Sequence, residues 1–423
     1  MKNYFKIFWA LLSLTLILNM SCENKYPDSI FNYDYTTKPT PVITVVEPQT
    51  GSFTGIGVIT ITGNNFSNIP AENHVYFSGN EGTTLTASET ELTIKVPAMA
   101  ISKSEGDSVV IKLRVDGAYA YATFGTLDYY PYKLQKAALQ YVSVDTIAHD
   151  LAGLAVDLQE RVYLFNRLGE GVIRIAHPDS DVYDYGTASS GPSRATGMKI
   201  GPGGYLYILK GNSNVLRIPP GGGSAETFVS ANSRINDLDF DQDLNLFAAG
   251  DGGAIECIKQ DASTFTAADY TDYDIDALRV FNGYVYVYAE YGGSSPDSVK
   301  AGIWRNPITS ANGELGAKEL VFDWGEHAGD SGPSVLCFTI LLDGRIMIGQ
   351  SDDDALVLLD PVTGQVEPFY SEILEPPFIY MSWGNGTVGN YLNVNRYSGF
   401  KSERQILRIS LDPSLQGAPY YGR

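Results

Sequence analysis

The chain has 423 residues and a formal net charge of −20 at pH 7, and hydrophobic residues make up 44% of it. This apolar content excludes wholesale disorder and is enough for more than one folded core. The acidic balance disfavours a nucleic-acid partner, because a polyanion would meet a repulsive field that no basic patch offsets. Abundant Gly and Tyr, 43 and 28 residues, are typical of turn-rich sheet proteins, so we expect an all-β fold.

The first 21 residues have the pattern of an export signal. Two lysines precede an apolar run from Ile7 to Leu18, which is shorter than the ~20 residues of a membrane-spanning helix. The run ends near Ser21-Cys22, and this resembles a bacterial lipoprotein signal, in which a small residue precedes the lipidated Cys. The resemblance implies lipidation of Cys22 and an outer-membrane, cell-surface location; plain secretion is the alternative. The polar residues 22–40 are predicted to form a flexible tether.

Residues 41–128 are predicted to form a β-sandwich. Short runs of β-branched residues alternate with polar ones, as in half-buried strands. The clearest run is Val58 to Phe66, which contains the turn sequence Gly63-Asn64-Asn65. Together with Pro48…Gly51 and a late strand from Leu92 to Pro97, it resembles the IPT/TIG immunoglobulin-like domain. The resemblance implies a spacer, which residues 129–138 join to the rest of the chain as a linker.

Residues 139–423 contain a repeat. Related strand openings recur at intervals of 40 to 60 residues, at Gly153, Gly197, Asp237, Ala277, Cys337 and Tyr380. This period, with turns after each first strand, predicts a six-bladed β-propeller and resembles NHL-type repeats. The last blade is one strand short. We expect residues 139–144 to supply that strand and close the ring, because an unpaired strand edge favours aggregation.

Long loops on the fourth and sixth predicted blades carry the candidate binding residues. Long loops on a rigid scaffold commonly carry function. Aromatic rings beside polar groups suit a sugar, which offers an apolar ring face and hydroxyls. The candidates are Tyr291, Trp324, His327, Arg396 and Tyr397. All are predicted on one face of the propeller; the alternative for each aromatic ring is that it caps a blade.

No catalytic constellation stands out in the sequence. The Gly-x-Ser-x-Gly nucleophile motif is absent, and the four histidines lack the close spacing of a zinc helix motif. Propeller hydrolases of the gluconolactonase type resemble this architecture and hold a divalent cation on the axis. The corresponding strands here begin at His149-Asp150, Arg194, Asn236-Asp237 and Asp276, without that family's Glu-Gly-Pro opening. No cofactor is predicted, although an axial or structural Ca²⁺ stays open.

The order of the domains resembles surface lipoproteins that accompany outer-membrane glycan importers. The resemblance implies a lipid-anchored, non-enzymatic protein whose propeller captures a glycan or another extracellular ligand. It also implies an importer complex as a partner. Two alternatives stay open: a metal-dependent lactonase- or lyase-like propeller enzyme, and a protein–protein scaffold. Cys257 and Cys337 fall inside predicted strands two blades apart, and we expect both to be buried and unpaired.

Overall fold

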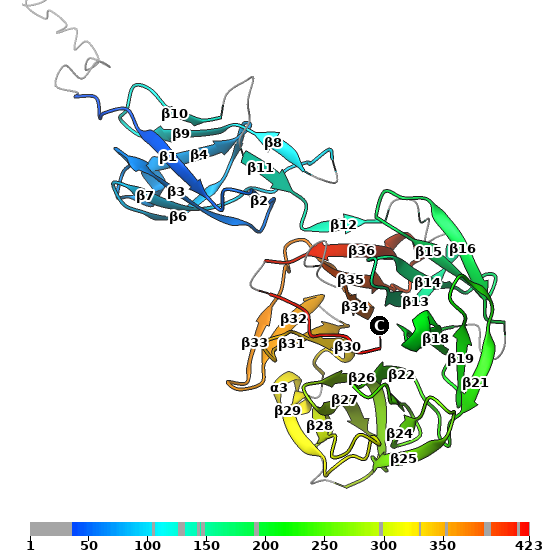
Figure 1. The fold of residues 1–423 in the computed structure, drawn as a ribbon. Helices are drawn as coiled ribbons and strands as arrows, with labels where there is room; N and C mark the ends of the chain where they lie inside the picture. The colour runs from blue at the N-terminus through cyan, green and yellow to red at the C-terminus, as the bar shows by residue number, and fades with distance from the viewer. Residues whose placement is uncertain are drawn as a thin grey trace, which may run out of the picture.

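The structure, a computed structural model, describes residues 36–103, 106–125, 132–141, 144, 149–189, 194–295, 299–329, 331–351, 354–384, 391–412 and 415–422. The predicted signal peptide and Cys22 lie outside this range. The chain folds into a small β-sandwich beside a wide ring of sheets (Figure 1). Within the residues described, no helix has the length and apolar character needed to cross a membrane.

The N-terminal domain is a β-sandwich, as predicted, with a small third sheet. One sheet has the order β1 (Val42–Glu47), β3 (Val58–Asn64), β7 (Glu91–Lys95) and β6 (Thr83–Ala87). The facing sheet contains β10 (Ala122–Phe124), β9 (Ile111–Val115), β4 (Asn73–Phe77) and β5 (Asn80–Glu81), and a 3₁₀ turn, η1 (Pro70–Glu72), precedes β4. Alternate residues of β9 are buried, which is the period-2 pattern of a strand with one face on the core.

The third sheet extends this domain beyond its predicted end. It contains β2 (Ser52–Phe53), β11 (Tyr132–Gln135) and β8 (Asp107–Val109). Tyr132 and Leu134 belong to the core of the sandwich and are 1% and 0% exposed. The segment predicted as a linker therefore includes a core strand, and Lys136 and Ala137 alone separate that strand from the propeller.

The second domain is a ring of six sheets, each with its first strand nearest the axis (Figure 1). Blade one contains β13 (Leu151–Val156), β14 (Val162–Asn166), β15 (Gly171–Ile175) and β16 (Val182–Thr187), with β20 (Gly223–Ser224) added to its edge. Blade two contains β17 (Gly197–Ile200), η2 (Pro202–Gly204), β18 (Leu206–Leu209), β19 (Asn214–Ile218) and β21 (Glu226–Ser230). Blade three contains β22 (Asp237–Phe240), β23 (Leu246–Ala249), β24 (Ala254–Ile258) and β25 (Thr264–Asp269).

The remaining blades complete the ring. Blade four contains β26 (Tyr273–Phe281), β27 (Tyr284–Tyr291), β28 (Ala301–Pro307) and β29 (Glu319–Asp323), followed by the short helix α3 (Trp324–Ala328). Blade five contains β30 (Val335–Ile340), β31 (Ile346–Gln350), β32 (Leu356–Asp360) and β33 (Gln365–Pro368). Blade six contains β34 (Phe378–Trp383), β35 (Tyr391–Arg396), η3 (Lys401–Glu403) and β36 (Gln405–Ser410), with β12 (Ala138–Gln140) as its outer strand.

Strand β12 closes the ring, as the sequence predicted. It pairs antiparallel with β36, Ala138 opposite Ile409 and Gln140 opposite Leu407. The next residue, Tyr141, continues the pairing, because its backbone N–H donates to the carbonyl of Ile406 at 3.0 Å. The first strand of the propeller thus completes the last blade, which removes an open edge from the ring.

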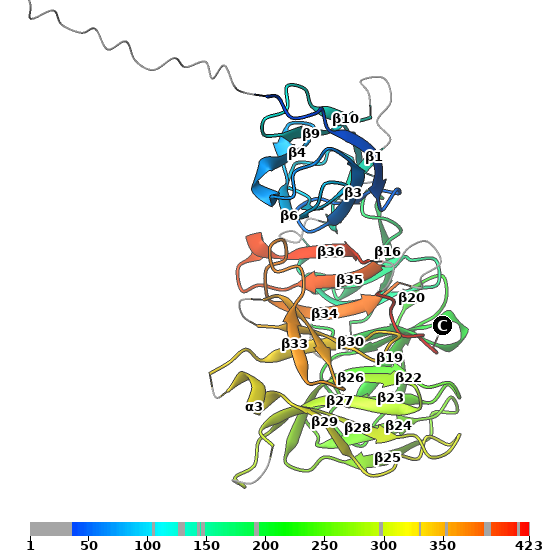
Figure 2. The same ribbon diagram turned by 90° about the vertical axis from the view of Figure 1, so that its left-hand side faces the viewer.

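The C-terminal tail, residues 415–422, covers one end of the propeller axis. It begins at blade five, where the backbone N–H of Leu342 donates to the carbonyl of Gln416 at 2.7 Å. It ends near blade two, where the Tyr420 hydroxyl donates to the carbonyl of Ile200 at 2.7 Å. The tail lies on the right in Figure 2, whereas α3 lies on the left, so these two segments belong to opposite faces of the ring.

The blades pack through apolar residues of their inner strands. Trp304 and Trp383 are 5% and 7% exposed, as expected of core residues. Cys257 and Cys337 are buried and unpaired, which confirms the prediction.

Candidate functional site

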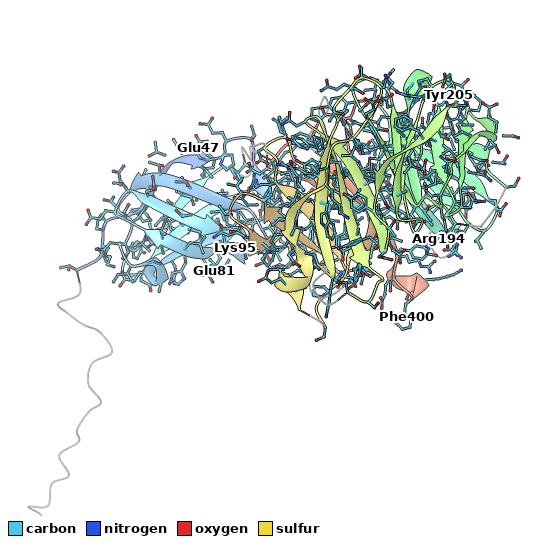
Figure 3. All side chains as sticks on the ribbon, turned by 90° about the horizontal axis from the view of Figure 1, so that it is seen from below. Glu47, Glu81, Lys95, Arg194, Tyr205 and Phe400 are labelled. Carbon is cyan, nitrogen blue, oxygen red and sulfur yellow. The ribbon has the colours of Figure 1, made fainter. Side chains whose placement is uncertain are left out.

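The innermost strands surround a cavity of about 570 Å³ on the propeller axis. Its lining residues lie at the starts of these strands and include Arg194. Figure 3 shows Arg194 and Phe400 on one face of the ring and Tyr205 on the other. We call the face with Arg194 the open face. At the far end the tail residues Ala418 and Tyr420 line a second, much smaller pocket of about 30 Å³.

Local irregularities in the strands determine which residues face the cavity. β-Bulges lie at Asp276 in β26, at Leu336 in β30 and at Ile379 in β34, and another lies at Gly153-Leu154 in β13. A bulge inserts one extra residue and redirects a side chain. In β26, β30 and β34 the inserted residue lines the cavity, and Leu154 does so in β13.

Two arcs of opposite character result from this arrangement. Blades five, six and one are consecutive in the ring, and they contribute the apolar arc, which consists of Leu336, Ile379 and Leu154. Blades two, three and four contribute the polar arc. Its members are Thr196 and Asn236, which directly precede β17 and β22, and the bulge residue Asp276. The mouth of the cavity is therefore amphipathic: the side formed by blades five, six and one is apolar, and the opposite side is polar.

Tyr380 gives the cavity wall an aromatic ring. It directly follows the bulge residue of β34, and its hydroxyl donates to the carbonyl of Ala195 at 2.7 Å. The side chain therefore reaches from blade six past blade one to the start of blade two. Burial raises the pKa of Tyr380, although the nearby Arg194 opposes the shift, so the phenol stays a neutral donor at physiological pH.

Three of the cationic residues that line the cavity, Arg194, Arg234 and Lys210, come from blades two and three. Arg194 and Arg234 each lie three residues before the first residue of an innermost strand, β17 and β22. Arg234 pairs with Asp251 at 3.2 Å, and its Nε donates to a backbone carbonyl. Arg194 has no hydrogen bond or ion pair to the part of the chain that the structure describes. Lys210 is buried, which lowers its pKa, and its Nζ donates to the carbonyl of Ala188 at 2.9 Å.

The acidic residues come from blades three and four, and Asp251 of blade three is the one that pairs with Arg234. Asp251, Asp276 and Glu290 all line the cavity. Asp276 is exposed to solvent at the cavity mouth, but partial desolvation by the surrounding walls raises its pKa to about 7, and repulsion from Glu290 and Asp251 adds to the shift. The more distant Asp274 acts in the same direction. Water reaches Asp276 through the cavity, so near neutral pH this carboxyl group can either donate or accept a hydrogen bond.

The floor of the cavity is an ion-paired layer. Asp237 contacts Arg279 at 2.5 Å and also accepts the backbone N–H of Leu278 at 3.0 Å. Asp239 accepts the N–H of Val280 at 2.9 Å and lies 3.9 Å from the Nζ of Lys199. These contacts tie neighbouring blades together. Arg279 also borders the 30 Å³ pocket, which has room for about one or two waters.

A metal centre has little support in this geometry. Among the described residues, no three His, Cys, Asp or Glu side chains are placed to hold a metal ion. The positions that correspond to the lactonase ligand set have other partners. Asp237 is paired with Arg279, the Asn236 amide donates to Asp251, and Asp150 is paired with Arg404. A cation would have to displace a guanidinium group or an amide from each of them.

The candidates on blade four make two separate sets of contacts, Trp324 with His327 and Tyr291 with Tyr273. Trp324 is the first residue of α3 and is 2% exposed, and its Nε1 donates to the carbonyl of Pro333 at 2.8 Å. The ring of His327 packs against it at 5.3 Å between centroids. Tyr291 is half-buried at the end of β27 and packs against Tyr273 at 5.1 Å. In this conformation Trp324 leaves no ring face open for a sugar.

The candidates on blade six form a separate cluster. Arg396 is 8% exposed and pairs with Glu375 at 2.7 Å. The ring of Tyr397 lies 3.9 Å from the guanidinium of Arg404, and its hydroxyl donates to Asp150 at 3.1 Å. The structure thus places the five candidates on two blades, four and six, and none of the five lines the axial cavity. Their role in ligand binding stays a prediction.

From the sequence, most of the cavity residues are recognisable only as members of the strand that begins each blade. Tyr380 was the opening of the sixth blade, and Arg194 and Asp276 were starting positions for a metal-site test. One signal could have singled out the arginines: the same residue type stands three positions before the openings Gly197 and Asp237 on neighbouring blades. The bulges gave no such signal, since a one-residue insertion within an apolar strand leaves its composition unchanged.

Comparisons with known proteins identify the N-terminal domain and the fold. The IPT/TIG domain family matches residues 41–131. No curated protein sequence matches the chain. A putative phosphatase from Bacteroides thetaiotaomicron is similar in structure, with 11% identity, a TM-score of 0.53 and coverage of 88% of this chain and 97% of its own.

Two further solved structures are similar. A luciferin-regenerating enzyme has 14% identity and a TM-score of 0.51, over 67% of this chain and 98% of its own. An auxiliary nutrient binding protein from Bacteroides thetaiotaomicron has 14% identity and a TM-score of 0.49, over 88% and 97%. At such identities a likeness shows the fold alone, which is an IPT/TIG sandwich followed by a propeller.

Proposed function

We propose that the propeller binds a carbohydrate in the axial cavity without converting it, and that the IPT/TIG domain serves as a spacer. The observation that carries the proposal is the amphipathic mouth of a cavity covered at its other end by the C-terminal tail. Its volume of about 570 Å³ lies within the range of small-molecule sites, roughly 300–1,000 Å³. A pyranose ring is amphipathic in the same way, with apolar C–H faces and polar hydroxyl edges.

The two arcs suggest how the sugar would lie. The ring of Tyr380, with Ile379 and Leu336 beside it, offers apolar contact for a sugar face. Across the mouth, Asn236 and Asp276 offer amide and carboxyl groups for the hydroxyls. A longer glycan that leaves the cavity over blade four would meet Tyr291, which directly follows the cavity residue Glu290. Trp324, His327, Arg396 and Tyr397 stay proposed as outer contacts of such a chain.

The cellular setting belongs to the same proposal. Lipidation of Cys22 would hold the protein at the outer membrane, and the tether and the IPT/TIG domain would set the propeller away from the surface. An importer complex would then receive the captured glycan. The support for this setting is the sequence pattern of the first 40 residues and the identified IPT/TIG domain.

The test is calorimetric titration of the exported form of the protein with a panel of mono- and oligosaccharides. We expect at least one sugar to bind. Tyr380→Ala should weaken it by ~1–3 kcal/mol, or roughly 5- to 150-fold, because a ring face buried by the sugar is lost. Tyr380→Phe keeps the ring and should bind nearly as the parent does.

Tyr183→Ala is the matched control, because this tyrosine is 54% exposed on the outer strand β16. It should leave the affinity unchanged. A parent protein that binds no sugar on the panel would remove the carbohydrate proposal. Binding that Tyr380→Ala leaves at the parent level would show that the sugar occupies another site.

One observation favours a second candidate, an enzyme. A carboxyl group with a pKa of about 7 inside a cavity, as Asp276 has, is suited to act as a general acid or base near neutral pH. The same panel distinguishes the two candidates when products are followed by chromatography. A sugar that the parent converts and that Asp276→Asn leaves intact would support the enzyme and overturn the non-enzymatic proposal.

A further inference from the structure

We infer that the preferred ligand of the axial cavity is an acidic sugar, whose carboxylate is bound by Arg194 with Arg234 beside it. The inference rests on the proposed function and adds to it the chemical class of the ligand. It assigns to the two arginines a specificity role that is separate from the binding of the sugar ring.

The two arginines are placed to meet a ligand at the cavity mouth. They occupy equivalent places on neighbouring blades, and both line the cavity. Arg194 lies on the open face (Figure 3) and has no partner among the described residues. The planar guanidinium group offers a fork of N–H donors that matches the two oxygens of a carboxylate. Arg194 is therefore a cation available to a ligand at the mouth.

The other charged residues of the cavity are distributed unevenly around its mouth. On the cationic side, Lys210 lines the cavity, but its charge is balanced by Glu170 at 3.8 Å, so among the described residues the uncompensated charge there is that of Arg194. On the blade-four side, Asp276 and Glu290 would repel a carboxylate, whereas Asp251 belongs to blade three and is already paired with Arg234. These acids can accept hydrogen bonds from sugar hydroxyls instead. The two sides together favour one orientation, with the carboxylate toward blades two and three and the hydroxyls toward blade four.

The cations at the mouth and at the floor of the cavity differ in how free they are to bind a ligand. Arg279 is the cation at the cavity floor, and it is 7% exposed. It is already paired with Asp237, and one of its N–H groups also donates to the carbonyl of Leu278. A ligand carboxylate would have to compete with Asp237 there, whereas no carboxylate of the described residues pairs with Arg194. The anionic group is therefore held at the mouth, and the ring lies against the apolar arc.

The experiment uses pairs of sugars that differ only at C6. Galacturonate is compared with galactose and glucuronate with glucose, as monosaccharides and as disaccharides, by calorimetric titration against the exported protein. We expect the acidic member of at least one pair to bind about 10-fold more tightly at low ionic strength, because its carboxylate gains a charge-assisted contact. The preference should shrink as salt is added, since ions screen exposed charges.

Two variants and a control assign the preference to residues. Arg194→Gln should reduce affinity for the acidic sugar about 10-fold and leave the neutral sugar unchanged, and Arg234→Gln should have a smaller effect of the same kind. Arg345→Gln is the control, because this arginine pairs with Asp343 in the β30–β31 hairpin, away from the cavity lining. It should change neither affinity.

The outcomes separate the inference from the proposed function. Equal binding of both members of every pair would overturn the acidic-sugar inference and leave sugar binding in place. A preference for the acidic member that persists in Arg194→Gln would overturn the role of this arginine. If neither member of any pair binds, and the wider panel also fails, both the inference and the proposed function fall.

Discussion

At the scale of single residues, Asp276 shows how a backbone irregularity creates a chemical property. The bulge in β26 turns this carboxyl group toward the cavity, where Glu290 and Asp251 also lie. Its pKa of about 7 follows from partial desolvation at the cavity mouth, where the side chain is still exposed, and from that repulsion. An aspartate in an unfolded chain has a pKa of about 3.9, so between these two values the folded protein holds a proton that the unfolded chain releases.

This difference predicts the pH dependence of stability. Because the unfolded chain binds fewer protons than the folded protein between about pH 4 and pH 7, the contribution of Asp276 to stability falls as pH rises through that window. Asp276→Asn removes the ionisable group, so its melting temperature should exceed that of the parent at pH 8, and the gap should narrow toward pH 4.

Asp184→Asn, an exposed carboxylate on the outer strand β16, is the control and should show no such trend. Differential scanning calorimetry from pH 4 to pH 8 makes the measurement. A variant that gains nothing at pH 8 would mean that Asp276 is not destabilised in its ionised form.

The site residues could be predicted only in part, because tertiary contacts decide which side chains of a loop are buried. The aromatic content of the long loops drew attention to Trp324, but its ring is covered where α3 packs on the blades. Asp323 supports that turn, since its side chain accepts the backbone N–H of Glu326 at 2.9 Å. Phe400, by contrast, is 71% exposed on the open face. Which aromatic residue a loop buries depends on its tertiary contacts, and these leave no mark on the loop sequence.

At the scale of elements, the propeller follows from repetition. Strand openings and hairpin turns recur in every blade, so the number of blades and the closing strand β12 were predictable. The C-terminal tail was not, because it is joined to the ring by one isolated bridge, Leu341 with Gly417, and by single hydrogen bonds such as that to Ile200, not by a regular ladder. Strand β11 was missed because its Tyr-rich surroundings carry no period that distinguishes a core strand from a linker.

The closing strand predicts a stability effect at Tyr141. This residue is 1% exposed, and its hydroxyl donates to Asn393 of β35 at 2.7 Å. Tyr141→Ala leaves a cavity and should lower the free energy of propeller unfolding by ~3–5 kcal/mol. Tyr141→Phe removes the hydrogen bond alone and should cost ~1–3 kcal/mol, because Asn393 then lacks its partner.

Urea unfolding followed by tryptophan fluorescence measures this effect in the propeller alone. The chain has four tryptophans, of which Trp304, Trp324 and Trp383 lie in the propeller and Trp9 in the predicted signal peptide. An unfolding midpoint for Tyr141→Ala equal to that of the parent would contradict the closing role of this segment.

At the scale of the whole molecule, the two domains touch. Lys95 of the sandwich forms an ion pair with Glu372, which follows β33 of blade five. The pair is exposed, and exposed pairs contribute at most about 1 kcal/mol. This contact alone is therefore too weak to hold the two domains in one fixed orientation. The net charge of −20 keeps such a molecule soluble and repels polyanions.

The proposed anchor predicts where the protein is found in the cell. We expect the parent to fractionate with the outer membrane, because two or more acyl chains give stable attachment. Cys22→Ala should move the protein to the soluble fraction, whereas Cys257→Ala, a change at a buried cysteine of β24, should leave it in the membrane. A Cys22→Ala protein that stays with the membrane would show that another part of the chain, or a partner, holds it there.

The central claim is that the axial cavity is the ligand site, and a crystal structure of the protein with its best-binding sugar tests it most directly. We predict electron density for the sugar at the mouth of the cavity, between the Tyr380 ring and the guanidinium of Arg194, with hydroxyls toward Asp276. An ordered sugar on the loops around Tyr291 and α3, or on the IPT/TIG domain, with only water in the axial cavity, would contradict the claim.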